Sequence, residues 1–179
     1  MPGMVLETVK VKEEVLTRAY ELGLLYEKSY HGCAQCTVAA IQDALEIRDD
    51  DLFRAANGLA GGLGSSSKGT CGSLAGGVMI ISSLCGRSRD QFDDPGRVRE
   101  RAYRLARRLL ERFEAEFGSG MCGEIQRRLM GRSFDLLDPQ DKEIFMKAGG
   151  ERIHCPDVVG KGGRWAVEII LDEGLVGGK

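Results

Sequence analysis

A chain of 179 residues is long enough for one domain with its own hydrophobic core, and we treat residues 1–179 as a single domain. The 42% hydrophobic and 29% charged residues are typical of a globular protein, and a net charge of −2 gives no reason to expect a nucleic acid or a membrane as partner. The longest apolar stretch, SLAGGVMIISSLCG, is shorter than the about twenty residues of a spanning helix. The N-terminus lacks the features of a signal peptide, so we expect a cytoplasmic protein.

Apolar residues that recur every three or four positions predict helices along most of the chain. In the first helix they are Val11, Val15, Ala19, Leu22 and Tyr26. Glycine, at 25 of 179 residues, clusters between the apparent helices. In chain order, the expected helices cover residues 5–27, 33–47, 52–59, 72–84, 94–117, 121–130, 139–147 and 156–171. No segment alternates with a period of two, so we predict an all-α fold, a helical bundle of about seven to eight helices.

The segment from Asp94 to Phe117 has the most regular pattern. One face is apolar, and the opposite face carries Arg97, Arg101, Arg104, Arg108 and Arg112. In an acidic protein we interpret this basic face as a solvated surface and not as a nucleic-acid-binding stripe. Its charges are balanced within the same segment by Glu100, Glu111 and Glu114.

Four of the six cysteines come from distant segments, and each stands at the start of an expected helix. Cys33, Cys71 and Cys122 follow glycine-containing turns, and Cys155 precedes Pro156, a residue favoured at the first helical position. A helix N-terminus carries unpaired N–H groups and a partial charge of about +0.5, which favours a thiolate over a thiol. Independent burial of four small residues is the alternative. We predict instead that these four cysteines form one site.

The other two cysteines stand in different positions. Cys36 follows Cys33 by three residues on the same side of one helix, so the two can share a metal ion or form a disulfide. Such a CxxC pair is also typical of thioredoxin-like redox sites, although these need a preceding strand that this sequence does not show. Cys85 lies at the far end of its helix, where the dipole disfavours a thiolate, and we interpret it as a small buried residue.

Scattered single cysteines favour an iron–sulfur cluster over structural zinc, which usually takes its ligands in two local pairs. Covalent haem is excluded at the CxxC motif because Thr37, not His, follows it. His31 and His154, the only histidines, each lie close to a cysteine in the chain and are candidates for ligands, for hydrogen-bond donors to ligands, or for exposed loop residues. The predicted metal ligands are Cys33, Cys71, Cys122 and Cys155, with Cys36 as the first substitute.

The glycine–serine loop before Cys71 has no nucleotide-binding motif. GSSSKGT, residues 64–70, lacks the Lys that must follow the second Gly of a phosphate loop. Its N–H groups can still form an anion nest beside cluster sulfurs, with Lys68 adding positive charge. Gly72 and Gly76 each cost a helix about 1 kcal/mol relative to Ala, so a second helix or a bulky cofactor should need the space beside Cys71. We therefore assign Lys68, Gly72 and Gly76 to cofactor binding.

Four cysteine motifs together resemble the C-GCAxxG-C-C family over about residues 17–173: GCAQ with Cys33, CGSLAG with Cys71, FGSGMC with Cys122 and CPDVVG with Cys155. The resemblance implies an all-helical domain with four characteristic cysteines and a redox or metal-binding role, without a particular reaction. Ser73 stands where the family's CGAxxG motif has Ala, and Cys36 is additional to its four cysteines. The architecture is also similar, more distantly, to the split-Soret cytochromes, whose haem motif is missing here.

The leading hypothesis is a protein that binds a [2Fe-2S] or [4Fe-4S] iron–sulfur cluster through four cysteines at helix N-termini and acts in electron transfer or redox sensing. We expect a redox protein as its partner, and the long apolar stripe favours a homodimer. One alternative is a thiol–disulfide oxidoreductase that uses Cys33 and Cys36. Another is a structural zinc protein with an all-cysteine site. We assign no catalytic residue, because the sequence shows no evident catalytic base.

Overall fold

The chain folds into helices joined by glycine-containing turns. A computed structural model describes the backbone of residues 2–176 and the side chains of residues 10–176. Two short 3-10 helices, η1 (Asn57–Leu59) and η2 (Arg89–Gln91), and a π-helical turn, η3 (Gly150–His154), accompany eight α-helices. The α-helices are α1 (Pro2–Tyr30), α2 (Cys33–Leu45), α3 (Asp50–Ala55), α4 (Gly72–Cys85), α5 (Arg99–Phe117), α6 (Cys122–Met130), α7 (Pro139–Lys147) and α8 (Cys155–Asp172). No strand occurs in residues 2–176, so the all-α prediction is confirmed.

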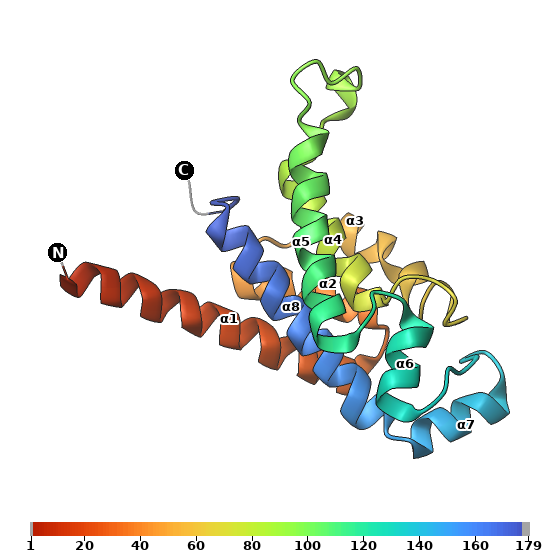
Figure 1. Cartoon of the computed structure of the whole chain (residues 1–179). Coiled ribbons are helices and arrows are strands. Elements are labelled where there is room, and N and C mark those ends of the chain that lie inside the picture. The colour runs from red at the N-terminus through yellow and green to blue at the C-terminus, as the bar shows by residue number, and fades with distance from the viewer. Residues whose placement is uncertain (1, 177–179) are drawn as a thin grey trace.

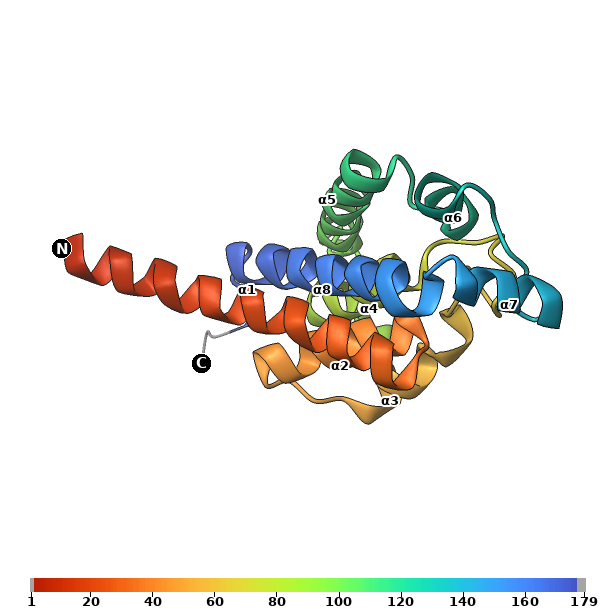
Figure 2. The same cartoon turned by 90° about the horizontal axis from the view of Figure 1, so that it is seen from below.

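Helix α8 occupies the centre of the molecule. It packs against α1, α2, α4 and α5, and Figures 1 and 2 show α1 running beside it and extending past it at the N-terminal end. Helix α4 contacts both α2 and α5. Helices α6 and α7 lie at one end of the molecule, and the loop between α4 and α5 projects from the other (Figure 1). Among the described residues, no helix combines the length and the apolar character needed to cross a membrane.

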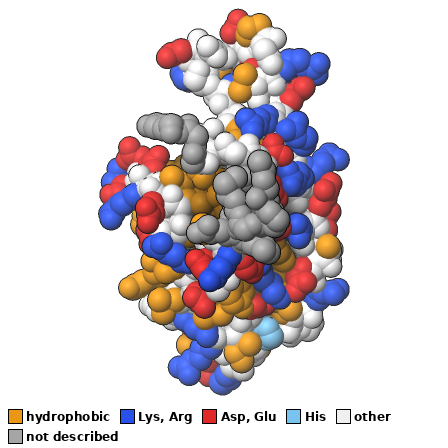
Figure 3. Space-filling model, turned by 90° about the vertical axis from the view of Figure 1, so that its left-hand side faces the viewer, with side chains coloured by type: hydrophobic (Ala, Val, Ile, Leu, Met, Phe, Trp, Pro, Cys, Tyr) orange, Lys and Arg blue, Asp and Glu red, His pale blue; other side chains and the backbone are white. Residues whose placement is uncertain are grey.

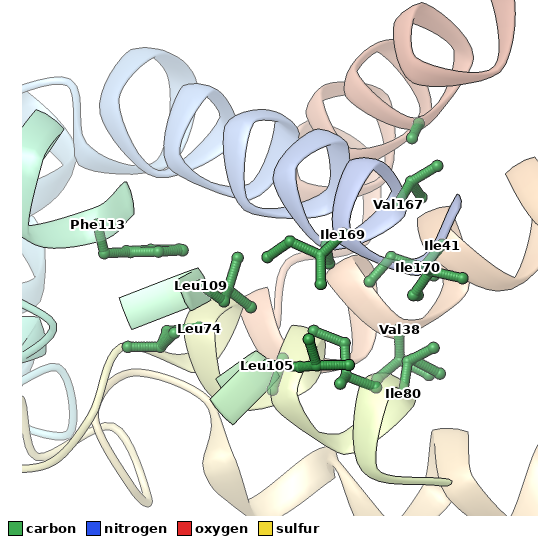
Figure 4. Packing of buried hydrophobic residues seen from close by; sticks show 14 of the residues in the cluster. Val38, Ile41, Leu74, Ile80, Leu105, Leu109, Phe113, Val167, Ile169 and Ile170 are labelled. Carbon is green, nitrogen blue, oxygen red and sulfur yellow. The ribbon is translucent and has the colours of Figure 1, made fainter. Parts of the chain in front are cut away.

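The hydrophobic core lies between α8, α2, α4 and α5. Figure 4 shows side chains from these helices meeting in one cluster, with Leu105 and Leu109 of α5 facing Ile169 of α8. Leu105, Leu109 and Phe113 have 0% exposure, and complete burial of such a side chain contributes about 1.5–3 kcal/mol. The apolar stripe predicted for this segment is therefore the face of α5 that forms the core.

The buried face of helix α1 overlaps only in part with the predicted one. Its buried residues are Leu16, Ala19, Gly23 and Glu27, whereas Val11, predicted on the apolar face, is 54% exposed. Gly23 belongs to this face because α1 and α8 lie close together there: a β-carbon on Gly23 would lie only 3.0 Å from Cα of Gly160 in that helix.

Helix α5 begins at Arg99, later than the predicted start at Asp94. The Asp94 side chain accepts hydrogen bonds from the backbone N–H of Val98 at 2.6 Å and of Arg99 at 3.3 Å. Asp94 and Arg97 both have positive φ, 52° and 53°. The residues between them therefore form a turn that Asp94 closes, and the helix starts only after it.

The arginines of α5 are paired mainly with acidic residues at the end of α8. Three of them reach Glu173, at 3.7 Å from Arg101, 3.5 Å from Arg104 and 2.6 Å from Arg108. Of the three glutamates predicted as partners, Glu100 pairs with Arg97. Figure 3 shows basic and acidic side chains mixed over one face of the molecule. The basic face of α5 therefore helps to hold α5 against the end of α8.

Candidate functional site

Four cysteines from four helices line one cavity. Cys33, Cys122 and Cys155 are the first residues of α2, α6 and α8, and Cys71 directly precedes α4. The cavity has a volume of about 180 Å³. Cys71 and Cys122 are buried, and Cys33 and Cys155 are half-buried. The fold thus brings four thiols together from segments that are far apart in the sequence.

A short backbone pairing holds Cys71 beside Cys122. The residues that precede these cysteines form an isolated antiparallel bridge. The N–H of Cys71 donates to the carbonyl of Gly120, and the N–H of Cys122 donates to the carbonyl of Gly69, both at 2.9 Å. The backbone therefore fixes the relative position of these two cysteines before their helices begin.

The glycine–serine loop supplies a backbone donor to the Cys33 sulfur. Residues 61–65 all have positive φ, between 56° and 71°, so the backbone makes a left-handed turn. Three of the five residues are glycines, which adopt this conformation without steric cost. The turn directs the N–H of Gly61 to Sγ of Cys33 at 3.4 Å.

Gly72 and Gly76 lie on the side of α4 that faces α2. A β-carbon on Gly72 would lie 2.3 Å from Sγ of Cys33, and one on Gly76 would lie 2.6 Å from the carbonyl oxygen of Ala34. The space that these glycines leave is therefore filled by the neighbouring helix and by the Cys33 side chain. A second helix was one of the two reasons that we expected for glycine here.

Cys155 differs from the other three cysteines in its backbone environment. The π-helical turn η3 runs directly into α8, and the N–H of Cys155 donates to the carbonyl of Gly150. Cys155 is thus the first residue of an α-helix, as predicted, but its own N–H is already paired. The expectation of a free helix N-terminus at Cys155 is wrong, because the helical backbone begins earlier, at Gly150. Such π-helical turns are often found at functional sites.

Of the remaining residues that we singled out, the two histidines line the cysteine cavity and the others lie outside it. His31 and His154 both line the cysteine cavity. Cys36 is not part of the cavity wall, and its thiol donates to the carbonyl of His31 at 3.2 Å. Lys68 is exposed and lines a separate hollow beside α6. Cys85 is buried, and its thiol donates to a carbonyl in the preceding turn of α4.

The thiols are not arranged around a single ion. Among residues 10–176, no three side chains of Cys, His, Asp or Glu form a group that could hold one metal ion. A tetrahedral zinc with Zn–S bonds of about 2.3 Å would need its sulfurs about 3.8 Å apart. The four cysteines line a cavity of about 180 Å³, which is larger than one ion.

Glu27, in the last turn of α1, is a cavity residue that the sequence analysis missed. It is 6% exposed and lines the cavity together with the four cysteines. Its Oε2 atom has no hydrogen-bond partner among the described residues. A signal did exist, because Leu16, Ala19, Gly23 and Glu27 follow one another at the spacing of a buried helix face.

A protein-family model described as "Putative redox-active protein (C_GCAxxG_C_C)" matches residues 31–169. This range covers most of the chain and contains all six cysteines. The chain belongs to the C_GCAxxG_C_C family. Neither a curated protein nor a solved structure gives a significant match. The family description assigns a redox-active role and names no cofactor.

Ser73, which stands where the C_GCAxxG_C_C motif has Ala, fits into the packing between helices. It has 0% exposure, and its Oγ lies 3.0 Å from Oγ1 of Thr37 and donates to the carbonyl of Val158 at 3.3 Å. A β-carbon on Gly162 would lie 2.1 Å from this hydroxyl. The additional oxygen is therefore accommodated by a glycine on α8.

Burial raises the pKa of each of the four C_GCAxxG_C_C cysteines. For Cys71 and Cys122 the pKa rises to about 12, and it also rises for Cys33 and Cys155. The next cause is repulsion between neighbouring thiolates, such as that of Cys122 on Cys71 and that of Cys33 on Cys155. The metal-free site therefore holds protonated thiols at neutral pH.

Backbone amides act against this rise but do not reverse it. The N–H groups of Gly61 and Gly72 lower the pKa of Cys33, and those of two residues in the first turn of α4 lower the pKa of Cys71. We expected helix N-termini to favour thiolates in this site. The amides have that effect, but the pKa values rise overall because loss of solvation and thiolate repulsion are larger.

Glu27 adds negative charge to the same cavity. Burial raises the pKa of Glu27 to about 7, the adjacent Cys36 thiol lowers it, and Glu151 raises it. Its carboxylate in turn raises the pKa of Cys33 and Cys155. The Cys36 thiol donates to the carbonyl of His31, and Oε2 of Glu27 has no hydrogen-bond partner among residues 10–176.

Proposed function

We propose that the protein binds an iron–sulfur cluster through Cys33, Cys71, Cys122 and Cys155 and acts in electron transfer or redox sensing. The observation that carries this proposal is the single cavity lined by four thiols from four separate helices. A bound cluster supplies one-electron transfer, which needs a redox partner protein and no substrate. Membership in a family described as redox-active supports the same role.

The residues present fit a cluster better than a single zinc ion. Cysteine thiolates are the usual ligands of iron–sulfur clusters, and four of them serve [2Fe-2S] and [4Fe-4S] equally. The cavity of about 180 Å³ exceeds the size of one ion.

The electrostatics of the cavity also favour a positively charged occupant. Burial, and after it the repulsion between four thiolates and a carboxylate, raises the pKa values so that the thiols keep their protons without metal. A bound cation stabilises thiolates and displaces their protons. The N–H of Gly61, directed at the Cys33 sulfur, would then stabilise the ligated thiolate further.

A thiol–disulfide oxidoreductase that uses Cys33 and Cys36 is the second candidate, because both thiols lie in the first turn of α2. A nucleophilic thiol of this kind needs a lowered pKa. Burial raises the pKa of both thiols, and Cys36 lies outside the cavity wall. These observations favour the metal-binding role over thiol exchange.

Purification without oxygen, followed by a visible spectrum and the content of iron, sulfide and zinc per chain, tests the proposal. We expect a brown protein with iron and acid-labile sulfide. Zinc without iron would support the structural alternative. A colourless, metal-free protein in which Cys33 and Cys36 oxidise to a disulfide would support the oxidoreductase.

Serine variants test the ligand set. Replacement of Cys33, Cys71, Cys122 or Cys155 by Ser should lower the iron content, since each removes a thiolate from the cavity. Cys85→Ser is the matched control, because its thiol is buried at the far end of α4 and bonds within its own helix. Iron loss in Cys85→Ser, or full iron content in Cys122→Ser, would contradict the assignment.

A further inference from the structure

Glu27 places a buried, unpaired carboxylate in the wall of the cysteine cavity. It is 6% exposed, and its Oε2 atom has no hydrogen-bond partner within residues 10–176. Burial of a carboxylate without a counter-charge is costly, so buried carboxylates are normally paired or bound to metal. The position of Glu27 therefore calls for a positive partner.

The described part of the protein does not provide that partner. Lys142, His31 and His154 also line the cavity, but none of them lies within ion-pair distance of Glu27. Glu151, the other acidic residue of the wall, acts on Glu27 by repulsion. Without an occupant, burial favours the neutral form of Glu27; a cation bound in the cavity would supply the counter-charge that its carboxylate lacks.

We propose that Glu27 binds the metal centre directly through Oε2, as an oxygen ligand beside the cysteine sulfurs. This inference rests on the proposed function in one respect, namely that the cavity holds a metal. Glu27 takes the place that the sequence analysis gave to Cys36, as the donor that can substitute for one of the four cysteines, because Cys36 lies outside the cavity wall and its thiol is bonded to the carbonyl of His31. Glu27 also precedes the residues 31–169 that the family model matches.

The C-terminal half of α1 holds Glu27 in a defined position. The Tyr26 hydroxyl donates to Asp43 of α2 at 2.6 Å, and the Tyr20 hydroxyl donates to Asp157 of α8 at 2.8 Å. Gly23, one turn before Glu27, lies against Gly160 of α8. These contacts fix α1 on two sides, so the carboxylate is preorganised to meet an occupant of the cavity.

X-ray absorption at the metal edge tests this inference. Protein is loaded without oxygen from a solution that offers both iron with sulfide and zinc, and the spectrum is recorded for the metal that binds. In the wild type we expect sulfur scatterers plus one oxygen scatterer at about 2.1 Å. Glu27→Gln should lose that oxygen scatterer. Glu151→Gln, which removes a carboxylate from the same wall, should keep it.

Each outcome decides between the two proposals. A wild-type shell of sulfur alone, or an oxygen scatterer that persists in Glu27→Gln, would overturn the role of Glu27 and leave the cluster proposal intact. Bound zinc with an oxygen scatterer that depends on Glu27 would overturn the cluster and support Glu27 as a ligand. A wild-type protein that binds neither metal would overturn both. The wild-type spectrum is informative even if Glu27→Gln fails to fold.

Discussion

A β-carbon on any residue that replaced Gly72 would lie 2.3 Å from Sγ of Cys33, closer than non-bonded atoms can approach. Gly72→Ala therefore forces α4 away from α2 or displaces the Cys33 sulfur. We expect a loss of about 1–3 kcal/mol in the free energy of unfolding, as for other overpacked sites, together with a lower metal content. Urea denaturation and metal analysis measure the two effects.

Gly58→Ala is the matched control for this substitution. A β-carbon on Gly58 would meet no atom within 4 Å, and the residue does not have positive φ. Its stability and metal content should match those of the wild type. Equal stability and metal content in the two variants would show that the close contact between Gly72 and Cys33 matters for neither property.

Gly162 and Ser73 should behave as an energetically coupled pair. Gly162→Ala places a β-carbon 2.1 Å from Oγ of Ser73 and 2.9 Å from Cζ of Phe113, so we expect it to destabilise the protein by about 1–3 kcal/mol. Adding Ser73→Ala removes the first clash and should recover part of that loss. A double-mutant cycle by thermal or urea unfolding should give a coupling of at least about 0.5 kcal/mol. Strictly additive effects would rule out this packing.

Glu173 joins three arginines of α5 to the end of α8, and its side chain is only 21% exposed. Glu173→Gln should lower the free energy of unfolding by about 1 kcal/mol, and the difference should shrink as salt screens the charges. Urea denaturation at low and high salt measures both effects. Glu143→Gln removes an exposed pair with Lys147 and should change stability little. Equal losses in the two variants would contradict a special role for Glu173.

Asp94 should make the protein sensitive to acid. Burial acts to raise the pKa of Asp94, but hydrogen bonds from Val98 and Arg99 hold it below its usual value of 3.8. In the unfolded chain the carboxyl takes up a proton at a higher pH than in the folded protein. The stabilisation by Asp94 is therefore present above pH 3.8 and is lost as the pH falls through the lower folded-state pKa.

Asp94→Asn removes this titration and should flatten the decline of stability with falling pH. Asn also tolerates positive φ, so the backbone turn before α5 can be kept. The urea midpoint of both proteins, measured between about pH 5 and pH 2, checks the expectation. Parallel profiles would mean that Asp94 does not contribute to the acid response.

The helices were predictable where local signals agree. Residues 139–147 were predicted as a helix and form α7, because Pro139 begins it and the Asp138 side chain accepts hydrogen bonds from the N–H groups of Gln140 and Asp141. The start of α5 was not predictable in this way. It depends on Asp94 and Arg97, which have positive φ although neither is a glycine. Local patterns thus locate a helix, while unusual backbone angles decide where it begins.

The grouping of the four cysteines in one cavity was predictable from the sequence, and the presence of Glu27 in the same wall was not. Four cysteines that begin helices can be read from the glycine and proline residues around them. Glu27 was missed because the larger apolar residues of α1 outweighed the pattern formed by Leu16, Ala19, Gly23 and Glu27. That Gly23 lies against Gly160 of a distant helix cannot be read from α1 alone. The π-helical turn before Cys155 has no sequence signal that we recognise.

Helix α6 has no extensive contact with another helix of the described chain; the backbone pairing that places Cys122 beside Cys71 and the burial of Ile125 in the core join it to the rest. A centre bound by both cysteines would hold α6 in place, and its loss would leave this end of the molecule open to proteases. We therefore expect the lifetime of the protein in the cell to follow metal supply and exposure to oxidants. Its abundance would then respond to both conditions without a dedicated regulator.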